Sequence, residues 1–241
     1  DYITSKLLED SGVDIILVGD SLGNVFSGYN NTLPVTVDHV IYHTQAVTRG
    51  STQSLIVADM PFLSYQVSKE KAKENAGRLI KEGGAQAVKV EANYIELDVI
   101  QSIIDIGIPV MGHLGFTPQS VYQLGGYKVQ GRLDKESEAL IQKAKKLESM
   151  GCFSIVLEMV PQKLAKEVTD VLNIPTIGIG AGKHCDGQVL VTQDLLNMTG
   201  QKTPKFVKHY GNLYNDMKTS IEAFKQDVKK GSFPDVEHTY D

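Results

Sequence analysis

The sequence lacks the features that mark several large classes of protein. It has two cysteines, Cys152 and Cys185, and no Cys-x-x-Cys pair, so a disulfide framework is not expected. No apolar run approaches the roughly 18 residues that span a bilayer, and no signal or lipidation motif is visible. The net charge of −5 leaves no basic surplus for nucleic acid or a membrane surface. These absences predict a cytoplasmic protein with no nucleic-acid or membrane partner.

The length and composition fit a single globular domain. The chain has 241 residues, of which 41% are hydrophobic and 22% are charged. α/β barrels commonly reach this length as one domain. We therefore expect residues 1–241 to form one domain that includes a C-terminal amphipathic helix at about 212–230.

Short apolar runs alternate with amphipathic helical patterns along the chain. Their near-continuous apolar character predicts strands that are buried on both faces, as in a parallel sheet. Helices are expected between them at 68–81, 134–150 and 162–172, each ended by glycine or a turn residue. The expected strands are 14–19, 55–59, 87–91, 109–113, 154–158, 175–179 and 189–191.

Repeated strand–helix units predict an α/β fold, and they favour a (β/α)₈ TIM barrel over an open doubly wound sheet. The chain offers seven candidate strands, one fewer than such a barrel needs, and it opens in a helical pattern at 2–10. We therefore expect that the first barrel strand is absent from this chain. Two long connections, 21–36 and 114–132, are typical of functional loops, and 114–132 is a candidate lid.

Ionisable residues stand at the carboxyl ends of five expected strands. In barrels and in open α/β sheets, this edge carries the active site. Taken singly, each residue fits a helix cap or a loop salt bridge equally well. Together, buried carboxylates need a cation, a proton or a lysine, because an unpaired buried charge costs several kcal/mol. The five residues are Asp20, Asp59, Glu91, His113 and Glu158.

Strand alternation adds a lysine to this group. Lys89 and Glu91 are two residues apart, so their side chains point to the same side of the strand, while Val88 and Val90 face the helices. A lysine on the inner side either pairs with a carboxylate or binds a substrate anion or a developing oxyanion. Both interpretations remain open at this stage.

The ligand types indicate which metal such a site prefers. Asp20, Asp59 and Glu91 offer only hard oxygen donors, which favour Mg²⁺. His39 and His43 lie four residues apart on an expected helix, but we interpret them as structural because no His-Glu-x-x-His pattern accompanies them. The glycine-rich stretch at 178–182 completes neither a dinucleotide-binding nor a Walker A pattern, and no Gly-x-Ser-x-Gly elbow is present.

Ten segments, in order along the chain, resemble the ketopantoate hydroxymethyltransferase family, whose barrel is similar to that of the phosphoenolpyruvate mutase and isocitrate lyase superfamily. The resemblance implies one-carbon transfer from 5,10-methylenetetrahydrofolate to 3-methyl-2-oxobutanoate, giving 2-dehydropantoate for pantothenate biosynthesis. The matching segments are VGDSLG, TLPVTVDH, ADMPF, VKVE, GHLGFTPQS, GGYKVQGR, LEMVP, IGIGAG, DGQVLV and PKFVK.

The resemblance also implies a role for each site residue. It assigns Asp20, Asp59 and Glu91 to Mg²⁺, and Glu158 to the general base. Substrate contacts are implied for Asp20, Ser21, Asp59 and Lys89, and we add His113 from its place on the same rim. The family forms large homo-oligomers, with a decamer expected.

Two other functions compete with this interpretation. One is a Mg²⁺-dependent carbon–carbon lyase of the same superfamily, which acts on a 2-oxo acid. A catalytic loop cysteine would favour it, and Cys185 is the candidate. The other is a non-catalytic barrel subunit, which is disfavoured because the candidate base and metal carboxylates are all present.

Overall fold

The computed structural model describes residues 1–240, and the chain divides into two compact units. The first comprises residues 1–189, and the second begins at Leu190. The expectation of a single domain over the whole chain stays a prediction. No helix among the described residues combines the length and the apolar character that a membrane span requires.

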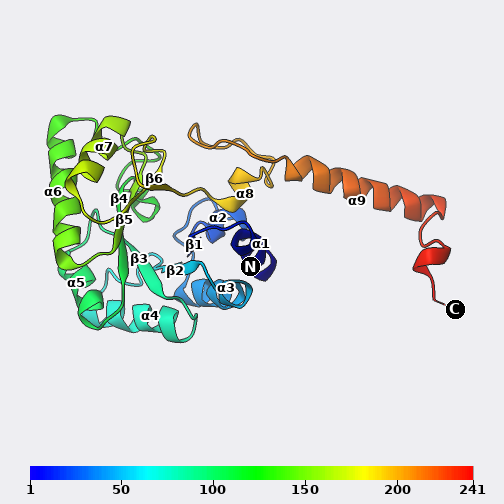
Figure 1. The fold of residues 1–241 in the computed structure, drawn as a ribbon, viewed down its shortest axis with the longest axis horizontal. Helices are drawn as coiled ribbons and strands as arrows, with labels where there is room; N and C mark the ends of the chain where they lie inside the picture. Colours follow the sequence, from blue (N-terminus) through cyan, green and yellow to red (C-terminus); the bar gives the residue numbers. More distant parts are fainter. Residues whose placement is uncertain (241) are drawn as a thin grey trace. The chain divides into compact units, whose positions relative to one another are not determined.

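The first unit is built on a curled parallel sheet with helices outside it (Figure 1). Each strand pairs with the next strand in the chain, without the reversal of order that defines a doubly wound sheet. This confirms the α/β class and the barrel-like arrangement. Within residues 1–240 the strands are β1 Ile15–Val18, β2 Leu55–Asp59, β3 Ala87–Glu91, β4 Val110–Gly115, β5 Ser154–Glu158, β6 Thr176–Ile179 and β7 Gly187–Gln188.

The seventh strand differs from the prediction. We expected it at 189–191, but β7 comprises Gly187 and Gln188, and only the backbone N–H of Val189 continues the ladder, to the carbonyl of Gly178. The sequence Val-Leu-Val is more apolar than Gly-Gln, so hydrophobicity alone shifted the expected strand toward the C-terminus.

The helices follow the strands in the expected order. Ser68 accepts a hydrogen bond from the backbone N–H of Lys71 and begins α4, while Gly151 ends α6 in the left-handed conformation with φ 101°. The longer helices of this unit are α1 Tyr2–Asp10, α3 Val37–Gly50, α4 Lys69–Lys81, α5 Asp98–Asp105, α6 Asp134–Met150 and α7 Gln162–Val171. Two short ones are α2 Leu22–Val25 and η1 Pro118–Ser120.

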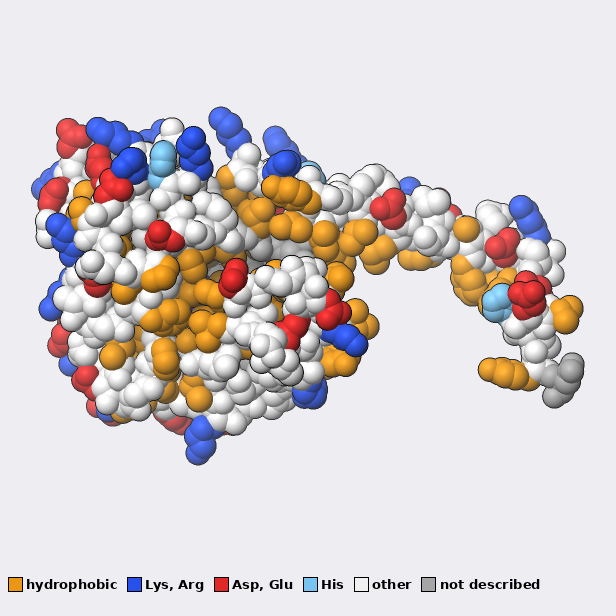
Figure 2. Space-filling view, viewed as in Figure 1, with side chains coloured by type: hydrophobic (Ala, Val, Ile, Leu, Met, Phe, Trp, Pro, Cys, Tyr) orange, Lys and Arg blue, Asp and Glu red, His pale blue; other side chains and the backbone are white. Residues whose placement is uncertain are grey.

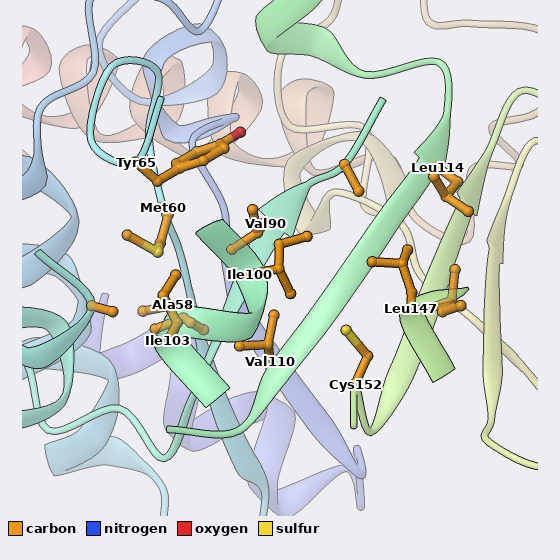
Figure 3. Packing of buried hydrophobic residues seen from close by; sticks show 14 of the residues in the cluster. Ala58, Met60, Tyr65, Val90, Ile100, Ile103, Val110, Leu114, Leu147 and Cys152 are labelled. Atoms are coloured by element: carbon orange, nitrogen blue, oxygen red, sulfur yellow. The ribbon is translucent and has the colours of Figure 1, made fainter. Parts of the chain in front are cut away.

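The outer face of the sheet packs on these helices. Val88 and Val90 are fully buried in the main core. Figure 3 shows Val90 with Ile100 and Ile103 of α5 and Leu147 of α6. This confirms that the two valines face the helices, as strand alternation predicts.

The inner face has two layers along the strand direction. Near the amino ends of the strands lies a small apolar cluster, separate from the main core. Two residues further along β2, β3, β4 and β5, the same face carries Asp59, Lys89, His113 and Glu158, all of them largely buried. The apolar cluster consists of Val57, Ala87, Met111 and Val156, with partly buried Ile15, Leu17, Leu55, Phe153, Ile177 and Ile179 around it.

The second unit contains α8 Thr192–Leu195, α9 Leu213–Lys230 and η2 Val236–His238. The predicted helix at about 212–230 is therefore confirmed. Five large apolar side chains of α9 are exposed, and apolar atoms gather along the helix in Figure 2. They are Tyr214, Met217, Ile221, Phe224 and Val228.

Candidate active site

The carboxyl ends of the first three strands bring two aspartates and the lysine together. Asp59 at the end of β2 forms an ion pair with Lys89 of β3, with 2.9 Å between Oδ1 and Nζ. The other oxygen of Asp59 accepts a hydrogen bond of 3.1 Å from the backbone N–H of Asp20. The parallel register causes this meeting, because Asp59 lies directly beside Lys89 in the sheet.

His113 of β4 joins Lys89 to Glu158. The Nζ of Lys89 lies 3.3 Å from His113 Nδ1, and His113 Nε2 lies 3.2 Å from Glu158 Oε2. Because an ammonium group only donates, Nδ1 must be the acceptor, and the imidazole proton then sits on Nε2. Among the described residues, Nε2 has no partner in hydrogen-bond geometry, so its contact with Glu158 is one of proximity. Glu91 stands on the other side, with Oε1 3.9 Å from His113 Nδ1.

Burial makes the carboxyl groups of this cluster poor acids. Desolvation and the charge of Asp59 raise the pKa of Asp20 to about 7, although Lys89 and a hydrogen bond from Gln119 oppose the rise. Desolvation, with a smaller contribution from Asp59, raises the pKa of Glu158 to about 8. Glu91 has its pKa raised well above the ordinary value, again mainly by burial.

The two basic groups respond in opposite ways. Burial alone would lower the pKa of Lys89, but the carboxylates of Asp59, Glu91 and Asp20 outweigh burial and hold its pKa above the ordinary value. His113 has its pKa lowered well below the ordinary value, by burial and then by the charge of Lys89. The cluster therefore holds a charged lysine beside a neutral imidazole.

A glycine and the turn after β5 fix the backbone of Glu158. Gly115 has φ +92° and lies so close to the Glu158 carbonyl that a Cβ would collide with it. The next residue, Phe116, donates a hydrogen bond of 2.7 Å to the same carbonyl. After Glu158, Met159 adopts φ +47°, an unusual conformation for a non-glycine residue. These constraints hold the carboxylate against the cluster.

Gln119 is a central residue of the site that sequence reasoning missed. Its side-chain nitrogen donates hydrogen bonds of 2.9 Å to Asp20 Oδ2 and to the carbonyl of Met60. Its carbonyl oxygen accepts a hydrogen bond of 2.7 Å from the hydroxyl of Tyr65. Its backbone N–H donates to the carboxylate of Glu91 at 3.1 Å. One buried residue, through its side chain and its backbone, thus joins two of the three candidate metal carboxylates.

The signal for Gln119 is weak in a single sequence. It lies in the long connection 114–132, within a segment that carries the family resemblance, but an amide has no charge to mark it. Its bond to Asp20 spans 99 residues, so no local pattern indicates it.

The remaining predicted residues lie where their local sequence suggests. Ser21 begins α2 beside Asp20, and its hydroxyl lies over Gly19, where a Cβ would be 3.0 Å from Oγ. His39 completes a capping box with Thr36 at the start of α3, which gives it a structural place. His43 stacks edge-on against Phe26, with ring centroids 4.6 Å apart.

The candidate metal ligands are all carboxylate oxygens, the donor type that a hard cation prefers. Among residues 1–240, no three His, Cys, Asp or Glu side chains already close around a common point at metal-ligand distance. However, Asp20, Asp59 and Glu91 are buried oxygen donors with one lysine among them, and the raised pKa values of Asp20 and Glu91 record unrelieved negative charge. A divalent cation would relieve it, so these residues fit Mg²⁺.

Comparison with known sequences gives consistent matches. The family model described as ketopantoate hydroxymethyltransferase matches residues 1–236. The chain is 52% identical to a 3-methyl-2-oxobutanoate hydroxymethyltransferase of Geobacter metallireducens, over 100% of this chain and 90% of that protein. It is 53% identical to the protein of the same name from Clostridium acetobutylicum, over 100% of this chain and 87% of that protein.

Solved structures show the same fold at low sequence identity. A 2,3-dimethylmalate lyase of the PEP mutase/isocitrate lyase superfamily matches with a TM-score of 0.59 and 16% identity, over 99% of this chain and 83% of that one. A phosphonopyruvate hydrolase in complex with oxalate and Mg²⁺ matches with a TM-score of 0.55 and 12% identity, over 99% of this chain and 85% of that one.

Proposed function

The chain belongs to the ketopantoate hydroxymethyltransferase family, and from that premise we propose that it converts 3-methyl-2-oxobutanoate to 2-dehydropantoate with 5,10-methylenetetrahydrofolate as the one-carbon donor. The product would serve pantothenate biosynthesis. Relatives at 52% and 53% identity carry the name of this transferase, which supports the assignment.

The observation that carries the chemistry is the Lys89–His113–Glu158 arrangement. It sets one charged lysine and one neutral imidazole beside a buried carboxylate whose pKa is raised to about 8. A carboxylate with a raised pKa is a stronger base than an exposed one. Such a base suits the removal of a weakly acidic proton next to a ketone.

In the first step, the carboxylate of Glu158 takes the proton from C3 of the keto acid. The electrons of the C3–H bond move into the C2–C3 bond, and negative charge develops on the keto oxygen. Lys89 supplies positive charge where that oxyanion forms, and it also suits the carboxylate of the substrate. His113 would stand beside the base as a neutral group, and its imidazole would take up no proton because its pKa is lowered.

Asp20, Asp59 and Glu91 would hold Mg²⁺, with Ser21 beside them as a further substrate contact. When bound, the metal would act as a Lewis acid toward the keto and carboxylate oxygens of the substrate. Gln119 would keep Asp20 and Glu91 in place through its amide and backbone N–H groups.

In the second step, water would cleave the two carbon–nitrogen bonds of the donor's methylene group, giving formaldehyde and tetrahydrofolate, whose two nitrogens take the protons of the water. C3 of the enolate then forms a bond to the formaldehyde carbon, and the resulting alkoxide takes the proton that Glu158 removed in the first step. The reaction consumes one water, so the site must admit water at this stage while it protects the enolate earlier.

Deuterium exchange tests the first step alone. The protein is incubated with 3-methyl-2-oxobutanoate in D₂O with Mg²⁺ and without folate, and proton NMR follows the C3 proton. We expect the C3 signal to disappear with Mg²⁺ and to persist with EDTA. A folded protein, shown by a cooperative thermal melt, that gives no exchange would refute the proposed enolisation.

The two competing functions receive less support. A lyase that uses a loop cysteine needs a reactive thiolate, but burial raises the pKa of Cys185, which lies half-buried beside Gly178. In a non-catalytic barrel, several buried carboxyl groups around one lysine would cost folding free energy without a function to retain them. Such a barrel would give neither exchange nor a Mg²⁺-dependent change in keto-acid binding.

We also propose that the protein is a homo-oligomer, with the decamer of the family as the expected size. The exposed apolar side chains of α9 support an association surface. Light scattering coupled to size-exclusion chromatography would measure the mass of the particle, and a monomer at micromolar concentration would refute this part. A cytoplasmic location belongs to the same proposal, since the reaction uses a folate donor.

A further inference from the structure

A cavity of about 260 Å³ lies beside the carboxylate cluster, in the first unit. Residues from four loops line it. They are Leu33 from the first long connection, Phe62 and Gln66 from the loop after β2, Tyr94 from the loop after β3, and Tyr122 and Gln123 from the second long connection. The amide of Asn31 donates a hydrogen bond of 3.3 Å to the hydroxyl of Tyr122. This bond joins the two long loops above the cavity.

The cavity meets the catalytic cluster at two residues, Glu91 and Gln119. Glu91 has one oxygen 3.9 Å from His113, and Gln119 donates to Asp20. Tyr65 also lines the cavity, and its hydroxyl donates to Gln119. A molecule in the cavity therefore lies next to the residues that are proposed to hold the keto acid and its metal.

The lining indicates an uncharged, planar ligand. Phe62, Tyr94 and Tyr122 present aromatic rings that are 36%, 50% and 77% exposed, which is unusual for side chains of this size in one small hollow. Gln66 and Gln123 add amide groups. Aromatic rings with amides at the edge suit a flat heterocycle that carries its own amide-like hydrogen-bonding edge.

The charge of the lining argues against the keto acid as the occupant. Within the described part of the chain, no Lys, Arg or His lines the cavity, and its one ionisable acidic residue is Glu91. An anionic 2-oxo acid would meet no positive charge there. Lys89 does not line the cavity and is paired with Asp59 instead. The two substrates would thus bind on opposite sides of Glu91.

We propose that this cavity holds the pterin ring of the one-carbon donor, stacked on Phe62 and Tyr94 and bounded by Tyr122. The inference rests on the proposed function, because that function supplies a donor with such a ring. A volume of about 260 Å³ is slightly below the range of roughly 300–1,000 Å³ that is typical of sites for whole drug-sized ligands. It suits one bicyclic ring, so the glutamyl tail would extend past the exposed tyrosines into solvent.

The test compares donor kinetics with keto-acid kinetics in three variants. Phe62→Ala and Tyr94→Ala remove stacking surface from the cavity. Tyr42→Ala is the matched control, because Tyr42 on α3 is 69% exposed and does not line the cavity. For each variant, the KM is measured for 5,10-methylenetetrahydrofolate and for 3-methyl-2-oxobutanoate, together with the C3 deuterium exchange without donor.

We expect Phe62→Ala and Tyr94→Ala to raise the donor KM about tenfold to a hundredfold, the range of aromatic stacking on a flat heterocycle. The keto-acid KM should stay within about twofold, exchange without donor should continue, and Tyr42→Ala should match the wild type. An unchanged donor KM in both cavity variants, or a fall in exchange that parallels the fall in turnover, would overturn the assignment.

A tail-free probe gives a second, independent result. The analogue 6-methyltetrahydropterin contains the ring without the glutamyl tail. It should compete with the donor but not with the keto acid, and Phe62→Ala should weaken its inhibition. Competition with the keto acid would place the ring on the wrong side of Glu91. Failure of the proposed function is distinguishable, because the wild-type protein would then show no exchange before any variant is made.

Discussion

Met111 and His113 point to the same side of β4, two residues apart, and both are 2% exposed, yet they belong to different layers of the interior. Met111 packs with Val57, Ala87 and Val156 in an apolar cluster. His113 belongs to the layer of ionisable groups, where it lies close to Lys89 and Glu158. The same strands thus supply packing at one level and chemistry at the next, separated by one strand repeat of about 7 Å.

The two layers contribute differently to stability and to activity. In the apolar cluster, which we call the lower layer, burial of apolar side chains favours folding. The ionisable residues two positions further along the strands form the upper layer. In the upper layer, burial shifts the pKa of Asp20, Glu91 and Glu158 upward, which records a cost of burying their charged forms. If the two layers act separately, substitutions among the ionisable residues should reduce turnover with little loss of stability. Substitutions in the apolar cluster should reduce stability with little loss of turnover.

The largest expected effect is on activity, in the upper layer. Glu158→Gln keeps the shape of the side chain but removes the carboxylate that is proposed to act as the base. Turnover should fall by roughly 10²–10⁴-fold, the usual contribution of general base catalysis. Keto-acid binding, measured by calorimetry with Mg²⁺, should persist, and the thermal midpoint should not fall. Turnover equal to that of the wild type would remove Glu158 from the role of base.

The second prediction concerns the lower layer, where we expect a substitution to reduce stability and to leave keto-acid binding unchanged. Met111→Ala removes a buried side chain from the apolar cluster and should lower the free energy of unfolding by about 2–5 kcal/mol. Urea denaturation would measure this loss. At a temperature where the variant is folded, the keto-acid KM should stay near the wild-type value. A KM that rises strongly would show that the two layers are coupled.

The third prediction compares two glutamines at opposite ends of the strands, the buried Gln119 and the exposed Gln86. Gln119→Leu removes the hydrogen bonds that Gln119 makes with Asp20, Tyr65 and the Met60 carbonyl, so we expect both stability and turnover to fall. Gln86 accepts a hydrogen bond of 2.9 Å from the backbone N–H of Ile56 at the amino end of β2. Gln86→Leu should reduce stability by a similar amount, about 1–3 kcal/mol, with kcat unchanged. Equal kcat losses in both would contradict the division into layers.

The fourth prediction concerns the two thiols, which lie outside both layers. Burial raises the pKa of Cys152 to about 12, so this group stays a protonated thiol across the usual pH range. Cys185 is half-buried, with its pKa raised to a lesser extent. At pH 8, a thiol-disulfide exchange reagent should modify Cys185 first and Cys152 only on unfolding. Mass mapping of the labelled peptides would detect the reverse order.

The smallest effect is expected at Glu9 on α1. Its carboxylate accepts hydrogen bonds from the hydroxyl of Ser51 and the backbone N–H groups of Thr52 and Ser54, and these bonds lower its pKa to about 2. A lowered pKa adds stability above the ordinary value of 4.5, and this contribution is lost as the pH falls toward 2. The difference in urea midpoint between wild type and Glu9→Gln should therefore narrow below pH 4.5. A constant difference from pH 7 to pH 4 would contradict this.

The parts of the fold that local chemistry specifies could be predicted from the sequence. The expected bounds of β2, β3 and β5 match the structure, because each is a continuous apolar run that ends in an ionisable residue. The helix caps at Ser68 and Gly151 were also predictable from residue type. The seventh strand was misplaced because a glycine–glutamine pair carries no strand signal of its own.

Only the ionisable residues of the candidate site could be predicted from the sequence. Strand alternation placed Lys89 and Glu91 on the inner face, and the structure brings Asp20, Asp59, His113 and Glu158 to the same group. Gln119 escaped notice because its importance lies in partners from other strands. The roles assigned to these residues in catalysis and metal binding stay predictions.

Gln119 also has a thermodynamic consequence. Its side chain holds Asp20, on the keto-acid side, and accepts the hydroxyl of Tyr65, which lines the proposed donor cavity. A ligand in the cavity that moves this amide would change the surroundings of Asp20. A ligand at Asp20 that moves the amide would change the surroundings of Tyr65 in the cavity. By linkage, any factor by which the donor tightens keto-acid binding is the factor by which the keto acid tightens donor binding. Substrate synergy in this enzyme would then depend on a single uncharged side chain.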